Sequence, residues 1–159
     1  HRMSTLEVKG IQAPAGYKLA MPAGHILQVV HGLSQTIVTT TSNSAHTSTG
    51  ITATITPSST SSKIWIMTKT TGVGTTSTDT LTAIFRGTVS GTNLTGNAST
   101  KYNHSNSEPS DMVNTFLDSP STTSATTYTL GIKSSVNGQT STANSATTDG
   151  TITLMEVAG

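Results

Sequence analysis

The sequence predicts an all-β protein, an antiparallel β-sandwich of jelly-roll type. The first observation is composition, because 35 threonines and 22 serines stand among 159 residues. Threonine suits a pleated, half-exposed strand. Leucine, glutamate, lysine and alanine, which helix bundles need, are scarce. The second observation is that no segment carries apolar residues at helical spacing over three turns, so we expect no helix longer than one turn.

The third observation is the alternation of apolar and hydroxyl-bearing residues. Ile51-Thr-Ala-Thr-Ile55 and Tyr128-Thr-Leu-Gly-Ile132 repeat with the two-residue period of a strand. Disordered Ser/Thr-rich chains combine low hydrophobicity with high net charge, whereas the net charge here is +1. We therefore expect folded strands, each with one buried face and one hydroxyl-bearing face.

Eight strands follow in order along the chain, separated by residues that form turns. Pro57 with its serines, Gly72 with Gly74, and Asn137-Gly138 punctuate them. Short strands at such regular spacing indicate a sandwich or jelly roll. The expected strands are 26–31, 34–40, 51–56, 63–69, 80–86, 111–118, 126–133 and 151–157.

The remaining segments are expected to be an N-terminal arm and two loops. Residues 1–24 are interpreted as a tag remnant, His1-Arg2, followed by an extended arm that lies on the sandwich or on another copy. Residues 25–159 then form one sandwich domain. Thr88 to Ser110 and Ser134 to Gly150 are long and polar, and loops of that length are usually functional or mobile.

Charge, cysteine content and hydropathy exclude several classes of protein. The eight Lys and Arg residues are scattered singly from Arg2 to Lys133, so no basic stripe is available for nucleic acid. No apolar run is long enough to span a membrane. The absence of cysteine removes disulfides, thiolate metal sites and a cysteine nucleophile.

No catalytic or cofactor motif is present. The sequence lacks Gly-x-Ser-x-Gly, Gly-x-Gly-x-x-Gly, a Walker sequence, His-Glu-x-x-His and an EF-type calcium loop. Asp79 and Asp118 could pair as glycosidase carboxylates, which need a set separation across a groove. With seven acidic residues in all, that pairing is little better than chance. We expect neither an enzyme nor a cofactor.

The histidines suggest two metal arrangements, neither with specific spacing. His25 and His31 are expected on one face of a strand about 20 Å apart, so they cannot share an ion, and they face water or a neighbouring subunit. A ring of one histidine from each copy around a symmetry axis stays open. His104, Glu108 and Asp111 could hold a divalent ion, but a solvated loop or a recognition surface explains them as well. No metal site is therefore assigned.

Two strands are apolar on both faces. Ile64 and Ile66 alternate with Trp65 and Met67, and near the C-terminus Ile152 and Leu154 alternate with Met155 and Val157. A two-layer sandwich buries only one face of each sheet. We therefore expect Trp65, Met67, Met155 and Val157 to lie at a subunit interface. The alternative is that Trp65 packs under a long loop of its own chain.

Six segments follow one another in a fixed order along the chain. They are Ile26-Leu-Gln-Val-Val-His31, Ile51-Thr-Ala-Thr-Ile-Thr-Pro-Ser-Ser-Thr-Ser-Ser-Lys-Ile64, Arg86-Gly87, Leu117-Asp-Ser-Pro120, Thr122-Thr-Ser-Ala-Thr-Thr-Tyr128 and Ile152-Thr-Leu-Met-Glu-Val157. This ordered series resembles small tail-fibre or virion structural proteins of marine and cyanobacterial phages. The similarity runs from about residue 26 to the end and includes the opening Met3-Ser-Thr-Leu-Glu-Val, but it fails between Gly91 and Met112.

The resemblance implies a β-sandwich head, assembled as a homotrimer and displayed on a virion among other virion proteins. The favoured function is a non-enzymatic tail-fibre or receptor-binding module that contacts the host surface, with glycan as the expected ligand. Because polar loops on a β scaffold usually carry binding, Tyr102, Asn103 and His104 are the expected contact residues. A capsid or tail decoration subunit without a ligand is the alternative, and a small polysaccharide depolymerase is the third possibility.

Overall fold

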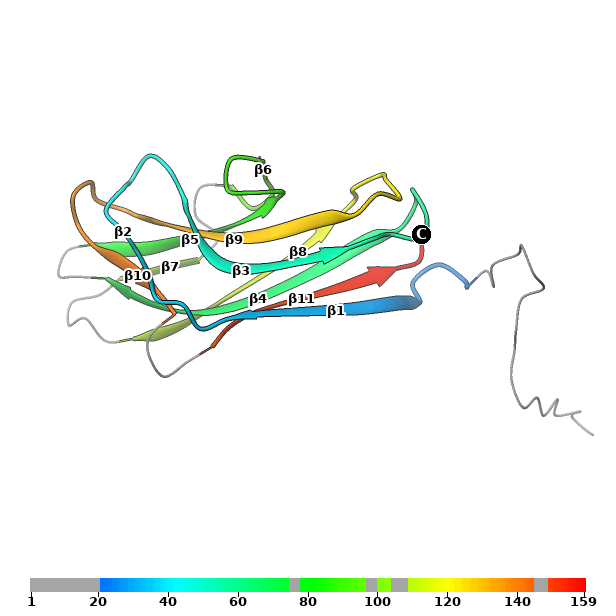
Figure 1. The fold of residues 1–159 in the computed structure, drawn as a ribbon, viewed down its shortest axis with the longest axis horizontal. Helices are drawn as coiled ribbons and strands as arrows, with labels where there is room; N and C mark the ends of the chain where they lie inside the picture. Colours follow the sequence, from blue (N-terminus) through cyan, green and yellow to red (C-terminus); the bar gives the residue numbers. More distant parts are fainter. Residues whose placement is uncertain (1–20, 75–77, 97–99, 104–108, 145–148) are drawn as a thin grey trace, which may run out of the picture.

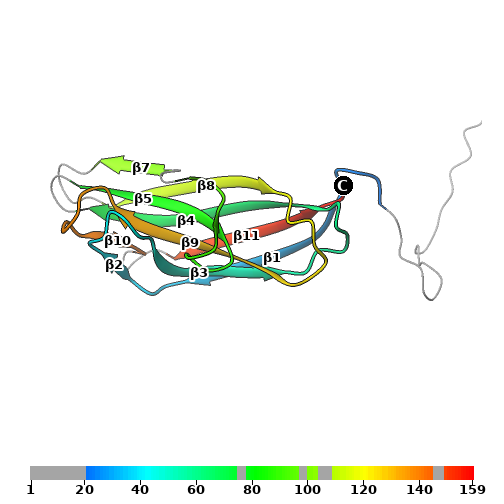
Figure 2. The ribbon, with the colours of Figure 1, turned by 90° about the horizontal axis from the view of Figure 1, so that it is seen from above.

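All regular structure that the computed structural model describes is β-strand, arranged as two antiparallel sheets that form two layers (Figure 1). The described ranges are 21–74, 78–96, 100–103, 109–144 and 149–159, with the backbone alone at 74 and 100–103. Figure 2 shows the strands of both layers running along the same long axis, which is the aligned packing of a sandwich. The predicted all-β class is confirmed.

The first layer, sheet A, has the strand order β1-β11-β4-β10-β2, with β8 on the other side of β4. The second layer, sheet B, has the order β3-β9-β5-β6, and β7 also pairs with β5. The strands are β1 (Ile26–Ser34), β2 (Val38–Thr40), β3 (Thr47–Ile55), β4 (Lys63–Gly74), β5 (Asp79–Arg86), β6 (Thr92–Asn93), β7 (Thr100–Asn103), β8 (Ser110–Asp118), β9 (Thr126–Ser134), β10 (Ser141–Ala143) and β11 (Gly150–Val157).

The connectivity is that of a jelly roll. β1 and β2 follow one another along one edge of sheet A, and β10 and β11 both pair with β4, so each pair acts as one interrupted strand. β6 and β7 both pair with β5 and are likewise counted as one strand, which leaves eight. Numbering these eight strands along the chain gives the order first, eighth, third, sixth in sheet A. Sheet B then reads second, seventh, fourth, fifth. Two interleaved Greek keys of eight strands are what define a jelly roll.

The expected strand at 34–40 is wrong in its extent. β1 continues to Ser34, and the next strand covers only Val38–Thr40. The break between them is held by side chains, because Asn144 Nδ2 donates to Thr36 O over 2.9 Å and Gln35 Nε2 donates to Asp149 Oδ1 over 2.9 Å. Sequence periodicity cannot reveal a break that a residue more than a hundred positions away stabilises.

Three short strands lie in the segments that we expected to be loops. β6 and β7 fall between Thr88 and Ser110, and β10 falls between Ser134 and Gly150. Each adds to an edge that would otherwise present unpaired backbone groups, since β6 and β7 pair with β5 and β10 pairs with β4. Hydrogen bonding to a neighbour therefore outweighs the absence of apolar alternation.

The interior is apolar at the end of the sandwich where the chain terminates. Inward-facing isoleucines and leucines of β3, β4, β9 and β11 meet there, with Tyr128 at 0% exposure among them. The two-residue alternation predicted these side chains except Ile84, because β5 is buried on both of its faces. The cluster is Ile51, Ala53, Ile55, Ile64, Ile66, Ile84, Tyr128, Leu130, Ile152 and Leu154.

The interior toward β2 and β10 is filled by hydroxyl and amide side chains, contrary to the expectation that hydroxyl residues face outward. Asn114 Nδ2 donates to Thr68 Oγ1 and Thr82 Oγ1, over 3.3 and 3.1 Å. Thr70 Oγ1 donates to Asn144 Oδ1 over 2.8 Å. All five side chains are buried, and burial is tolerated because each polar group has a partner.

The expected arm, residues 1–24, lies almost wholly outside the described residues. Where its last residues are described, the chain is tied to the C-terminus. Gly24 N donates to Ala158 O and Ala158 N donates to His25 O, both over 2.8 Å. The sandwich thus begins next to the point where it ends.

Candidate functional site

An exposed apolar row crosses the outer face of sheet A. In the strand register, Trp65 of β4 lies opposite Met155 of β11 on one side and Leu117 of β8 on the other. Met155 in turn lies opposite Val29 of the edge strand β1. Trp65 is 40% exposed and Val29 is 57% exposed. We call these four residues the apolar row.

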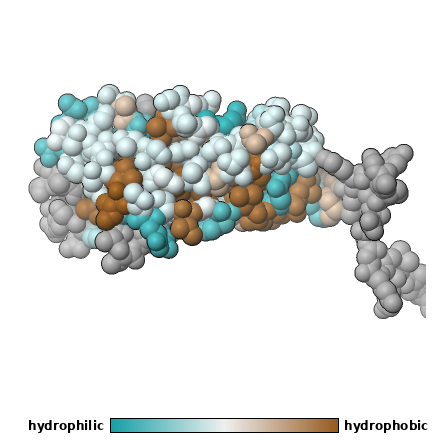
Figure 3. Space-filling model, in the orientation of Figure 1, coloured by the Kyte–Doolittle hydropathy of each residue, from teal (hydrophilic) through white to brown (hydrophobic). Residues whose placement is uncertain are grey.

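Two further rows continue this face along the strands. The next row joins His31, Thr153, Met67 and Thr115, and the one after it joins Leu33, Thr151, Lys69 and Val113. Leu33 and Val113 are more than half exposed. In Figure 3 hydrophobic residues, coloured brown, gather along the lower part of the view, where Figure 1 places β1. The apolar side chains of these rows are interrupted by His31, Thr153, Thr115, Thr151 and Lys69. Exposed apolar patches on one face are a feature that interaction sites often have.

The four residues expected at a subunit interface all lie on this face. Trp65 and Met67 are exposed, and Met155 and Val157 are half-buried. The described part of the chain leaves two fifths of Trp65 uncovered, so it does not support the alternative that a loop of the same chain buries this ring. Sequence reasoning missed Val29, Leu33, Val113 and Leu117, whose shared face becomes visible only through the register of β1 and β8.

The expected binding loop around Tyr102 is a strand in part. Tyr102 and Asn103 belong to β7, with Tyr102 opposite Thr80 and Asn103 opposite Asp79 of β5. The loop interpretation is wrong at these two positions, because the edge of β5 offers backbone partners. His104 and Glu108 lie outside the described residues.

The candidates for metal binding that the structure describes are His25, His31 and Asp111. His25 precedes β1, and its Nδ1 lies 3.0 Å from Pro22 O, whereas His31 Nδ1 lies 3.1 Å from Thr153 Oγ1. A register shift between Ile26 and Gln28 invalidates the parity argument for the two histidines. Asp111 Oδ2 lies 3.1 Å from Lys69 Nζ. Among the described residues, no three His, Asp or Glu side chains lie close enough to hold a metal ion.

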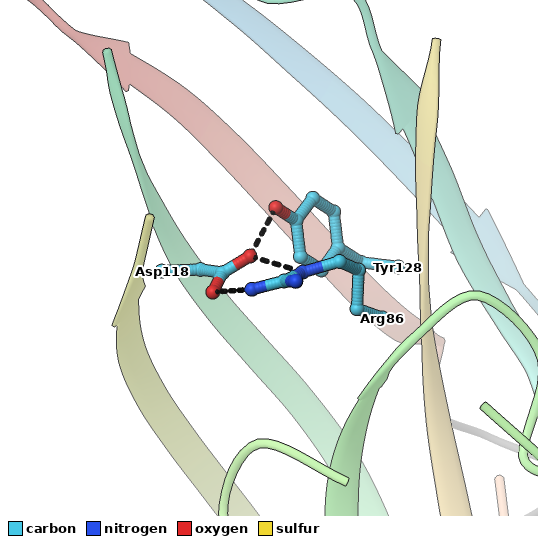
Figure 4. Close-up of polar contacts among 3 residues, drawn as sticks. All are labelled: Arg86, Asp118 and Tyr128. Atoms are coloured by element: carbon cyan, nitrogen blue, oxygen red, sulfur yellow. Dashed lines mark hydrogen bonds and ion pairs between the residues drawn. The ribbon is translucent and has the colours of Figure 1, made fainter. Parts of the chain in front are cut away.

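A buried charged cluster links the two sheets (Figure 4). Arg86 and Tyr128 come from β5 and β9 of sheet B, and Asp118 ends β8 of sheet A. Arg86 Nε donates to Asp118 Oδ2 over 2.8 Å, and Arg86 Nη2 donates to Asp118 Oδ1. Tyr128 Oη donates to Asp118 Oδ2 over 2.7 Å. The Asp118 side chain is 4% exposed and that of Arg86 is 33% exposed.

The electrostatics of this cluster favour a structural role, in which Asp118 holds the two sheets together through fixed hydrogen bonds. Burial raises the pKa of Tyr128, and the hydrogen bond to Asp118 raises it further. The hydrogen bond to Asp118 also raises the pKa of Arg86. The phenol therefore keeps its proton and the guanidinium keeps its charge. Both carboxylate oxygens are engaged, so no group here is free to act as a base or a nucleophile.

The geometry contradicts the glycosidase pair of Asp79 and Asp118. Asp118 is bound to Arg86 at one end of β5, and Asp79 opens the same strand seven residues away. At about 3.3 Å per residue that is roughly 20 Å. Glycosidase carboxyl groups stand less than about 10 Å apart.

Glu156 is a second buried carboxylate, fully enclosed beneath the β3–β4 loop. It accepts hydrogen bonds from Gln28 Nε2 over 2.6 Å and from the backbone N and Oγ of Ser58 over 2.7 and 2.6 Å. Burial raises its pKa, but the hydrogen bonds from Ser58 and Gln28 outweigh this effect, so its pKa lies below its usual value. Glu156 anchors the loop that contains Pro57.

A sequence signal for both buried carboxylates exists. Asp118 stands in phase with Met112, and Glu156 in phase with Ile152 and Leu154, so each continues the buried side of its strand. A charged residue at a position that faces the interior indicates a buried hydrogen bond or ion pair, because a buried charge is stable only when it has such a partner.

Comparison with known proteins gives a likeness of fold. No protein-family model matches the chain, and no curated protein matches it. In the described part of the chain, no helix is long and apolar enough to cross a membrane. A chain from the solved structure of infectious bursal disease virus, Gt strain, superposes with a TM-score of 0.52 at 12% identity. The match covers 96% of this chain and 43% of that chain, so this chain spans less than half the length of the viral one, and what the two share is the β-sandwich fold.

Proposed function

We propose that this chain is a non-enzymatic structural protein of a virus particle. The observation that carries the proposal is the jelly-roll strand order of its two sheets. Viral capsid domains are among the main users of this architecture. The likeness to a chain in a virus structure supports the same interpretation.

The disposition of the charged groups supports a structural role. Asp118 joins the two sheets through Arg86 and Tyr128, and Glu156 fastens the β3–β4 loop. The oxygens of both carboxylates accept hydrogen bonds from other parts of the same chain. The outer face of sheet A, in contrast, leaves apolar side chains available for assembly.

Electron microscopy of the particle tests this proposal. Antibodies raised against the purified chain should label intact virions of the virus that encodes it, and mass spectrometry should find the chain in particles purified by density gradient. Antibody pre-absorbed with the chain is the control. Particles that lack the chain would overturn the virion role, while the position of the label would separate tail from capsid.

Within the particle, we propose a tail-fibre or receptor-binding head that contacts host glycan. The resemblance of the sequence to phage fibre proteins supports this position, and jelly rolls also occur in lectins. The resemblance also implies that the chain assembles as a homotrimer, and this stays a prediction. A decoration subunit of capsid or tail, without a ligand, is the competing assignment.

The residues Tyr102, Asn103 and His104 provide a test of attachment. Replacing Tyr102 and His104 together by Ala should weaken binding to host cells or purified surface polysaccharide and leave the melting temperature within a few degrees. The exposed Thr54 on β3 offers a control position, as Thr54→Ala. Unchanged attachment of the double variant would favour the decoration role.

A further inference from the structure

We propose that the outer face of sheet A is the contact between two copies of this chain. The two copies are related by a two-fold axis that lies in the plane of this face and crosses the strands at the level of Met67. This goes beyond the proposed function, since it concerns the isolated chain and holds whether or not the chain is part of a virion. It competes with the trimer that the resemblance implies, because both assemblies would use the same face.

The pattern of side chains on the face is symmetric about that level. The central row consists of His31, Thr153, Met67 and Thr115, taken from β1, β11, β4 and β8. On β1, Val29 and Leu33 stand two residues to either side of His31. On β8, Leu117 and Val113 stand two residues to either side of Thr115. Each edge of the face thus carries an apolar side chain before and after the central row.

An in-plane two-fold axis turns this pattern into complementarity. The rotation places each strand over the same strand of the second copy, running in the opposite direction. Val29 of one copy therefore meets Leu33 of the other, and Leu117 meets Val113. Met67 meets the second Met67 on the axis. Trp65 comes over Lys69, whose stem can pack on the ring while its ammonium group gains a cation–π contact. A surface that matches itself in this way is what an isologous contact requires.

The charged groups are also complementary under the same rotation. Lys63 stands four residues before Met67 on β4, and Asp111 lies opposite Thr71, four residues after Met67. Lys63 of one copy therefore comes over the row of Asp111 in the second copy, one strand to the side. Asp111 already pairs with Lys69 of its own chain at 3.1 Å, so it would stand between two cations. The axis produces this contact twice.

The size of the face suits a stable pair. Four strands spaced about 4.8 Å apart and nine residues long at about 3.3 Å each cover roughly 570 Å². Two copies would then bury about 1,100 Å² in total, above the ~1,000 Å² that a specific interface needs. The apolar side chains lie in the rows on either side of the central row, and the charged Lys63 and Asp111 lie toward the ends of the face, so its rim is polar, as it is in such interfaces.

Sedimentation equilibrium of the purified chain tests the pairing. We expect a dimer at micromolar concentration. Met67→Asp places two carboxylates at the axis and should weaken dimerisation on the order of a hundredfold. The matched control is Thr54→Asp, which adds the same charge to the exposed outer face of sheet B and should change nothing. Circular dichroism and melting of each variant confirm that it folds.

Cross-linking locates the axis, because the chain contains no cysteine of its own. Two sheets packed face to face lie about 10 Å apart, so a short bismaleimide should join two Met67→Cys chains and should not join two Thr54→Cys chains. In the same assay Lys63→Glu should weaken the dimer, because it replaces the cation that comes over the row of Asp111 with an anion.

Four results would overturn the proposal. They are a monomer at micromolar concentration, a trimer, a dimer that survives Met67→Asp, and equal cross-linking at positions 67 and 54. A monomer would leave the virion location intact, since that is read from the particle itself.

Discussion

Asp118 shows how much of this fold depends on one side chain. Asp118→Ala would leave the Tyr128 hydroxyl buried without the acceptor it now has, and would remove the carboxylate that Arg86 binds. Because Arg86 is one-third exposed, water can solvate its charge, so we expect a loss of about 3 kcal/mol in the free energy of unfolding. Tyr128→Phe removes one hydrogen bond and should cost about 1 kcal/mol.

Urea unfolding measures both losses, and the single tryptophan, Trp65, reports on it through fluorescence. Thr54→Ala, on the outer face of sheet B, is the control for an exposed substitution. A loss for Asp118→Ala no larger than that for Tyr128→Phe would mean that the ion pair with Arg86 contributes nothing to the link between the sheets.

His46 gives the stability a pH dependence of known sign. Burial and then the charge of Lys133 lower its pKa to about 4, and its ring packs edge-on against Phe85 at 5.0 Å. In the unfolded chain a histidine has a pKa of about 6.5. The unfolded state therefore binds a proton first, and stability that is fully present above about pH 6.5 is lost as the pH falls toward 4.

The melting temperature between pH 7.5 and pH 4.5 tests this dependence. His46→Gln should show a flatter profile over that window than the native chain does. Glu156 acts in a separate range, because its lowered pKa makes its contribution disappear only below about pH 4.5. A native profile that is flat down to pH 4.5 would contradict the burial of the His46 ring.

At the scale of single residues, parity on a strand was the strongest predictor. It placed Trp65 and Met67 on the face opposite Ile64 and Ile66, as the structure does. It could not show that Asp118 meets Arg86, because 32 positions separate the two residues and they meet only when two different sheets pack together.

At the scale of elements, β1 and β3 close one edge of the sandwich, and the backbone of β3 passes close to Gly32 of β1. A Cβ at position 32 would lie 2.2 Å from the carbonyl oxygen of Thr52 on β3. A backbone oxygen cannot give way as a side chain does, so Gly32→Ala should destabilise the fold by about 1–3 kcal/mol.

Thermal unfolding of Gly32→Ala checks this close approach, with Thr54→Ala on the same β3 strand as the control. The variant should keep its β-sheet circular dichroism spectrum and melt at a lower temperature. An unchanged melting temperature would mean that β1 and β3 can separate at this edge without cost.

The long strands could be predicted from alternation, and the short ones could not. β4, β9 and β11 repeat apolar residues every second position. β2, β6, β7 and β10 have two to four residues each and consist almost wholly of polar residues. β6, β7 and β10 pair with edges of β5 and β4, and β2 pairs with β10. That pairing is information about the assembled sheet and not about the local sequence.

At the scale of the whole molecule, composition correctly predicted the fold class, but the prediction of which side chains fill the interior was wrong. Threonine was expected on exposed faces, yet Thr68, Thr82 and Asn114 are buried together between the sheets. A chain with only 32% hydrophobic residues lacks the apolar side chains to fill a sandwich of this length. Short hydroxyl and amide side chains fill the remainder because each finds a partner within the interior.

This interior predicts a specific non-additivity. Asn114→Leu would leave the buried hydroxyls of Thr68 and Thr82 without the amide they now bond, so it should cost about 2 kcal/mol. Replacing all three residues together, as Thr68→Val, Thr82→Val and Asn114→Leu, removes both sides of each bond. Apolar groups of similar shape then occupy the same space, and the triple variant should recover most of that loss. Urea unfolding of the native chain, the Asn114→Leu variant, the Thr68→Val/Thr82→Val variant and the triple variant completes the cycle. Additive losses would show that these residues act separately, and that the polar half of the interior is not one hydrogen-bonded unit.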